Sequence, residues 1–145
     1  MKVPANILVA TDFSDNADTA LDYAVALAHK LDAKIHLLNV IGLPISGYAG
    51  ESETDLSSLL AGNQQELDRL ASSHASQALF GPTLLKVANA RDVYDLIDTT
   101  ATEVDADLIV MGTHARSGIS RLLHGSVAES VVRTALCPVL VIRAL

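Results

Sequence analysis

The sequence LIVMGTHARSGISRLLHGS, residues 108–126, is the stretch from which the fold can be worked out. Leu108–Met111 is a short apolar run typical of a buried strand, and three glycines, several hydroxyls and two arginines follow it. Glycine permits the close approach of a ligand or of another backbone segment. A strand that leads through such a loop to a helix N-terminus often binds phosphate. A plain strand–turn–helix connection would have the same spacing.

Charge along the chain favours the phosphate interpretation. The net charge of −7 argues against a nucleic-acid-binding protein or one that binds acidic membranes. Residues 1–111 contain six Lys and Arg against sixteen Asp and Glu, whereas residues 112–145 contain four Arg against one Glu. The only positive segment therefore includes the glycine loop, as expected of a site for one small anion.

Length and composition predict a single domain over residues 1–145, large enough to bury a core. No apolar run approaches the roughly 20 residues of a membrane helix, and the N-terminus does not resemble a secretory signal. The one cysteine, Cys137, cannot form an internal disulfide and is interpreted as a small apolar residue. These features predict a cytoplasmic protein with no membrane association.

Apolar periodicity predicts strands that alternate with helices. The predicted strands are residues 6–10, 33–41, 83–87, 106–111 and 138–142, and the predicted helices are about 15–31, 56–78, 93–104 and 126–135. Ser14 or Asp15 is expected to cap the first helix. The Gly- and Pro-containing segment 42–54 is expected to be mobile, and the polar third strand to lie at an edge.

This alternation predicts an α/β fold: an open five-stranded parallel sheet with helices on both faces, Rossmann-like in its winding. Ligands of such sheets bind beyond the carboxyl ends of the strands, where the winding reverses. The order 3-2-1-4-5 puts that reversal between the first and fourth strands, and hence the site between Thr11-Asp12 and Gly112. A flavodoxin-like order would move it between the first and third strands, but the glycine loop after the fourth favours the former.

Several enzyme classes are excluded by their motifs. The turn after the first strand, Thr11–Ser14, has no glycine, which argues against a dinucleotide enzyme, and a P-loop is excluded because no Lys follows Lys86. Ser126 lacks the second glycine of a nucleophile elbow and is interpreted as a helix cap or phosphate ligand. The five histidines show no metal-ligand pairing, although His114 could meet a ligand. Asp12 could bind ribose hydroxyls or a metal-bound water, or could cap the first helix.

Taken together, these segments resemble the universal stress protein family over essentially the whole chain. The resemblance rests on ILVATDFS (7–14), ADLIVMGTH (106–114), GSV (125–127) and CPVLV (137–141). It implies the order 3-2-1-4-5, a homodimer through the last strand (Val139–Ile142), and one of two subclasses. The ATP-binding subclass has the motif Gly-x2-Gly-x9-Gly-Ser/Thr, which Gly112, Gly125 and Ser126 match. Ala115 replaces the second glycine, and a positive φ at this position would cost Ala about 1 kcal/mol or more relative to Gly.

The resemblance also implies roles for individual residues. Asp12 would hold the ribose or lie beside the adenine, and Gly112 would contact the ribose. Val40 would present its backbone to the adenine edge, with Ala10 and Met111 as apolar neighbours. The phosphates would be held by the backbone N–H groups of Ala115, Gly125, Ser126 and Val127, with Arg116 and Ser117 nearby. Any Mg²⁺ would be held mainly by phosphates and water.

The resulting hypothesis is a dimeric stress-response sensor or regulator that binds ATP, ADP or AMP and acts on an unknown protein partner. No group is placed to activate a water for phosphoryl transfer, so we expect no enzyme activity beyond slow hydrolysis. Two alternatives remain open at this stage: a nucleotide-free interaction module of the same fold, motivated by Ala115, and a slow ATPase.

Overall fold

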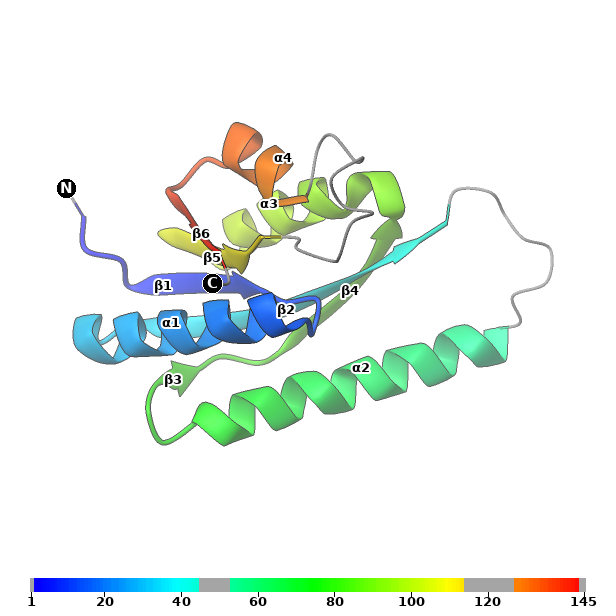
Figure 1. The fold of residues 1–145 in the computed structure, drawn as a ribbon, viewed down its shortest axis with the longest axis horizontal. Coiled ribbons are helices and arrows are strands. Elements are labelled where there is room, and N and C mark those ends of the chain that lie inside the picture. The colour runs from blue at the N-terminus through cyan, green and yellow to red at the C-terminus, as the bar shows by residue number, and fades with distance from the viewer. Residues whose placement is uncertain (1, 45–52, 114–126, 144–145) are drawn as a thin grey trace.

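A computed structural model describes residues 2–44, 53–113 and 127–143 of the chain (Figure 1). A parallel sheet lies between two pairs of helices. Its strands are β1 (Asn6–Ala10), β2 (Lys34–Leu43), β3 (Leu79–Phe80), β4 (Leu84–Asn89), β5 (Leu108–Gly112) and β6 (Val139–Ile142). The helices are α1 (Asp15–Leu31), α2 (Glu53–His74), α3 (Val93–Glu103) and α4 (Val127–Thr134), with a short 3₁₀ turn η1 (Ala90–Asp92). The predicted α/β class is confirmed.

The strand order is β3-β2-β1-β5-β6, and β4 also pairs with β2. β3 and β4 occupy the same edge of β2, at its beginning and its end, and are separated by residues 81–83. The predicted order and the approximate positions of the five strands are therefore correct, and the sixth strand is the two-residue β3. The prediction that the loop begins at residue 42 is wrong, because β2 continues through Gly42 and Leu43, which pair with β4. The prediction that the second helix continues to about residue 78 is wrong, because the backbone turns after His74, whose carbonyl accepts the N–H groups of Gln77 and Ala78.

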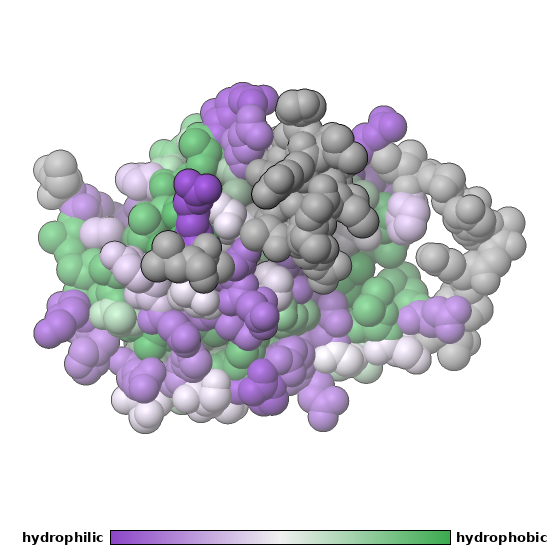
Figure 2. Space-filling model, in the orientation of Figure 1, coloured by the Kyte–Doolittle hydropathy of each residue, from purple (hydrophilic) through white to green (hydrophobic). Residues whose placement is uncertain are grey.

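Each face of the sheet has its own apolar core. On one face α1 and α2 cover Ile7, Val9, Ile35 and Leu37, and Leu67 and Leu70 come from α2. On the other face α3 and α4 cover the alternate strand residues, among them Leu8, Leu38, Ile109 and Met111. Strand side chains alternate between faces, so the short apolar runs of β1 and β5 supply both cores. Figure 2 shows that the outer surface of α1 and α2 is mostly hydrophilic.

Short polar residues set the helix ends. Ser14 caps α1, since its hydroxyl accepts the N–H of Ala17 at 3.2 Å, which confirms one of the two predicted caps. Asp32 after α1 and Asp105 after α3 both have φ of 53°. Asp tolerates this left-handed conformation better than most residues, and it turns the chain back toward the sheet. Among the described residues, no helix has the length and apolar character needed to cross a membrane.

Candidate functional site

The winding of the chain reverses between β1 and β5, the two central strands. Ala10 and Met111 are register partners at the carboxyl ends of these strands. The chain leaves β1 toward α1 on one face, whereas α4, which follows β5, covers the opposite face. A partly open cleft of about 120 Å³ lies at this point. Small-molecule sites of parallel α/β sheets commonly lie at such a winding reversal.

Six of the ten predicted site residues line this one cleft: Ala10, Asp12, Val40, Met111, Gly112 and Val127. They come from four separate segments of the chain. The other four, Ala115, Arg116, Gly125 and Ser126, lie outside the described residues, as does His114, so their roles stay predictions. The structure therefore brings together the residues predicted for the base and ribose and one of those predicted for the phosphates, Val127.

Thr11, which the predicted topology already placed beside the site, also lines the cleft. Sequence reasoning missed six further lining residues: Ser14, Ala17, Val93, Ile97, Thr113 and Ala128. Val93 and Ile97 were interpreted only as the apolar face of a helix. Their position at the start of α3, which packs on the same sheet face as Met111, gives them a second role as one wall of the cleft. Apolar side chains from the sheet and from α3 thus supply much of the lining, which suits an uncharged ring.

Asp12 lies in a tight, hydrogen-bonded turn between β1 and α1. Its Oδ1 accepts the N–H of Ser14 at 2.9 Å, and the hydroxyl of Thr11 accepts the N–H of Phe13 at 3.0 Å. Phe13 has φ of 65°, a conformation that costs a bulky side chain energy and that often occurs at functional sites. The helix cap is Ser14, so Asp12 fixes the cap residue and does not itself cap α1.

Gly112 is needed for close packing between β5 and α1. It is the last residue of β5 and pairs with Ile142, so the backbone is still in the strand there. A Cβ at this position would lie 2.7 Å from the carbonyl oxygen of Asn16 and 2.8 Å from its carbon. The Asn16 side chain in turn donates to the carbonyl of Thr113 at 2.9 Å. The first turn of α1 is therefore held directly against the end of β5.

Val40 offers backbone groups on the edge of β2 that faces the cleft. β1 ends at Ala10, but β2 continues to Leu43. The carbonyl of Leu38 accepts the N–H of Thr11 at 2.8 Å across this edge. Backbone groups of a strand alternate between its two edges, so the N–H and C=O of Val40, two residues later, point to the same edge, past the end of β1.

A buried polar chain supports this turn from the face opposite the cleft. The amide of Asn39 donates to the carbonyl of Thr11 at 2.8 Å, and the amide of Asn63 in α2 donates to Asn39 Oδ1 at 3.0 Å. Thr11 and Asn39 are only 5% and 4% exposed. Sequence reasoning missed Asn39, although an amide inside the apolar run LLNVI was a signal for it.

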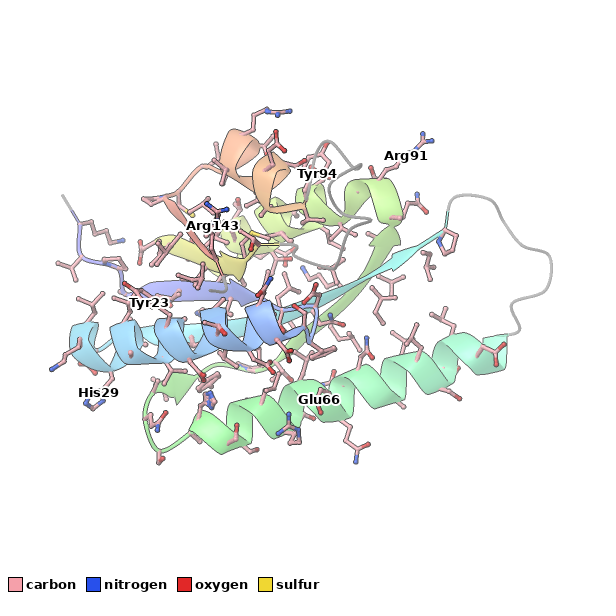
Figure 3. The ribbon with its side chains drawn as sticks, in the orientation of Figure 1. Tyr23, His29, Glu66, Arg91, Tyr94 and Arg143 are labelled. Atoms are coloured by element: carbon pink, nitrogen blue, oxygen red, sulfur yellow. The ribbon has the colours of Figure 1, made fainter. Side chains whose placement is uncertain are left out.

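The described lining contains one charged side chain, that of Asp12. Of the four arginines in the positive segment, Arg133 pairs with Glu129 on α4 at 3.3 Å and Arg143 follows β6, while Arg116 and Arg121 lie outside the described residues. Figure 3 shows Arg91, in the η1 turn before α3, pointing away from the sheet. Within the described segments, no cluster of His, Cys, Asp and Glu could hold a metal ion.

A parallel α/β sheet with a small-molecule cleft at its winding reversal defines a class of ligand-binding proteins, and the comparisons with known proteins identify the family. Residues 5–143 match the model of the universal stress protein family, and the chain belongs to that family.

Three relatives illustrate the similarity. Universal stress protein MJ0531 of Methanocaldococcus jannaschii is 33% identical over 94% of this chain and 81% of its own length. The solved structure of hypothetical protein MJ0577 has a TM-score of 0.82, with 25% identity and 99% of both chains covered. A universal stress protein of Archaeoglobus fulgidus, solved in complex with dAMP, has a TM-score of 0.65, with 25% identity over 97% of this chain and 99% of its own.

Proposed function

We propose that this protein binds an adenine nucleotide in the cleft between β1 and β5 and acts as a stress-response sensor or regulator. The observation that carries the proposal is the convergence of Ala10, Asp12, Val40, Met111, Gly112 and Val127 on one cleft. These are the described members of the set that the family resemblance implies. The dAMP complex of the Archaeoglobus relative supports a nucleoside monophosphate as the minimal ligand.

The chemistry of the cleft suits an adenosine better than a bare anion. An adenine ring would fit against the apolar side chains of the lining, such as Met111 and Ile97, with its polar edge toward the backbone of Val40. The carboxylate of Asp12 is a strong acceptor for ribose hydroxyls. The phosphates would extend toward the N-terminus of α4 at Val127, where the helix dipole favours negative charge. Mg²⁺ would enter with the phosphates and be coordinated mainly by them and by water.

We propose a binding protein and not an enzyme. The described lining offers one carboxylate, and Asp12 already accepts the N–H of Ser14. Phosphoryl transfer needs a positioned water and cationic stabilisation of the γ-phosphate. A slow ATPase would require turnover that Asp12→Asn abolishes in a folded protein, and its detection would replace the sensor proposal with a catalytic one.

The decisive experiment combines native mass spectrometry of the purified protein with calorimetry after any ligand is stripped. We expect AMP, ADP or ATP to bind, and Asp12→Asn to weaken binding about tenfold through loss of a charged hydrogen bond. Asp15→Asn is the matched control, because it removes the same charge three residues away without altering the cleft lining. The absence of binding heat at about 1 mM nucleotide would refute the proposal. A dissociation constant of that size corresponds to a binding free energy of about −4 kcal/mol.

The second candidate is a nucleotide-free interaction module, favoured by Ala115 in place of the motif glycine. It predicts normal folding with no thermal shift on addition of ATP. Ala115→Gly distinguishes the two: on the sensor proposal the substitution tightens ATP binding about fivefold to tenfold. If the wild type does not bind ATP and Ala115→Gly creates binding, the module is supported.

We further propose that the chain acts in the cytoplasm as a homodimer that pairs through β6. β6 is the end strand of the sheet order, and all four of its residues are only partly buried. The neighbouring Leu136 is 95% exposed. Occupancy of the cleft would then be reported to a protein partner through the dimer surface. Sedimentation of the purified protein with and without AMP tests this arrangement, and a monomer under both conditions would refute it.

A further inference from the structure

Asn39 occupies a position in β2 where an apolar residue would be expected. Leu37 and Leu38 before it are fully buried, Ile41 after it is 8% exposed, and Asn39 itself is 4% exposed. A buried amide is costly unless its donors and acceptor are satisfied. Here the amide donates to Thr11 and accepts from Asn63, so two elements of the fold meet at this side chain.

The direction of both hydrogen bonds is fixed by chemistry. A backbone carbonyl can only accept, so the Asn39 group that faces Thr11 must be the NH₂. The Asn39 oxygen is therefore turned toward α2, where Asn63 supplies the donor. Replacing the Asn63 amide would leave a buried acceptor without its partner and release the orientation of Asn39.

Thr11 is fixed at three atoms. Its N–H donates to the carbonyl of Leu38, its hydroxyl accepts the N–H of Phe13, and its carbonyl accepts the Asn39 amide. Only the last of these bonds depends on a side chain outside the turn. The peptide carbonyl that it holds directly precedes Asp12, and Phe13 next to it has positive φ. A strained turn persists only where its surroundings hold it in place.

We propose that Asn63 and Asn39 are positioning residues that connect α2 to the Thr11–Ser14 turn, so that nucleotide affinity depends on the packing of α2. This inference rests on the proposed function, because the turn includes Asp12. By linkage, an occupied cleft stabilises the contact of α2 with β2 to the same extent that this contact strengthens binding. Helix α2 is thereby a place where a partner could sense or set the state of the cleft.

The test compares Asn63→Ala with Gln64→Ala. Gln64 is the next residue of α2, and its amide bonds Asp68 and Thr83 and has no hydrogen bond to the turn. The first measurement is hydrogen exchange of the Phe13 and Ser14 amides without ligand. We expect faster exchange at these two amides in Asn63→Ala only, and unchanged exchange there in both variants would overturn the proposal.

The second measurement is AMP affinity by calorimetry, with unfolding by urea measured in parallel. We expect Asn63→Ala to weaken AMP binding about tenfold and Gln64→Ala to leave it unchanged, even where both lower stability. Asn39→Asp is the second variant, because its carboxylate keeps the shape and can accept from Asn63 but has no hydrogen to donate to Thr11. It should weaken AMP binding at least as much. Equal affinities in all variants would overturn the proposal.

Because the coupling between the cleft and α2 acts in both directions, a third measurement can be made on the wild type. Saturation with AMP should slow hydrogen exchange in α2 around Asn63, and Asn63→Ala should abolish that effect. Slowing that persists in Asn63→Ala would contradict the route through this amide. If the wild type does not bind AMP, the proposed function fails. The ligand-free exchange experiment still decides whether α2 controls the turn.

Discussion

Gly112→Ala is the substitution for which the structure gives the sharpest expectation. The new methyl group would lie 2.7 Å from the carbonyl oxygen of Asn16 and 3.1 Å from the nitrogen of Ala17. Both are backbone atoms in the first turn of α1, and they cannot turn away as a side chain can. The backbone of Gly112 does not have positive φ, so the effect comes from crowding and not from conformational preference.

The expected loss of stability follows from overpacking. Inserting one methyl group into a tightly packed contact costs about 1–3 kcal/mol. Relief requires α1 to move away from β5, which would also stretch the Asn16–Thr113 hydrogen bond of 2.9 Å. Because Ala17 and Gly112 both line the cleft, the same movement should weaken AMP binding.

Urea denaturation measures the loss of stability in Gly112→Ala, with Gly62→Ala as the control variant. Gly62 lies within α2, and a Cβ there meets nothing within 4 Å, so the identical change should raise the free energy of unfolding by about 1 kcal/mol through helix propensity. The two substitutions are thus expected to have opposite signs. A Gly112→Ala variant as stable as the wild type, with unchanged AMP affinity, would refute the packing argument.

Three further predictions concern charge and the sheet edge. Two backbone N–H groups and Lys2 lower the pKa of Asp107, so its carboxylate stabilises the fold at neutral pH, and this stabilisation is lost as pH falls through the lowered pKa. Urea titrations at several pH values should therefore show Asp107→Asn less stable than the wild type at neutral pH, and the difference between the two proteins should narrow in acid. Burial raises the pKa of Asp98, so the stability of the wild type falls as pH rises through that raised pKa. In the same titrations, the stability of Asp98→Asn relative to the wild type should be higher at neutral pH than at acid pH. Val141→Pro removes an N–H from the outer edge of β6 and should give a folded monomer by sedimentation if β6 forms the dimer, whereas Val141→Thr should not.

The fold could be predicted because its signals are local. Short apolar runs such as residues 7–10 are typical of strands buried on both faces, and their alternation with amphipathic helices leaves few topologies. The missed strand and the overlong predicted helix are next to each other in the chain. β3 is two residues long, too short for any period to be visible, and it directly follows the segment that the apolar spacing assigned to the end of a helix.

The candidate site was predictable where it depends on chain position and less so where it depends on packing. Asp12 lies just after β1 and Gly112 is the last residue of β5, so topology alone brings them together. Gly112 was expected to contact ribose, and its contact with Asn16 could not be anticipated because it depends on how closely α1 approaches β5. The Asn39–Asn63 contact joins residues 24 positions apart on two elements, and no local pattern shows such a pair.

The divided edge formed by β3 and β4 bears on how copies of the chain could assemble. An unbroken sheet edge can recruit further strands, and a molecule with two such edges can grow into an open-ended fibre. Here one edge is split at residues 81–83, where Pro82 has no N–H to offer, and its first piece is only two residues long. Growth by strand addition is thereby discouraged on that side. Pairing at the opposite edge would close after two copies, which gives the chain a built-in limit on its own polymerisation.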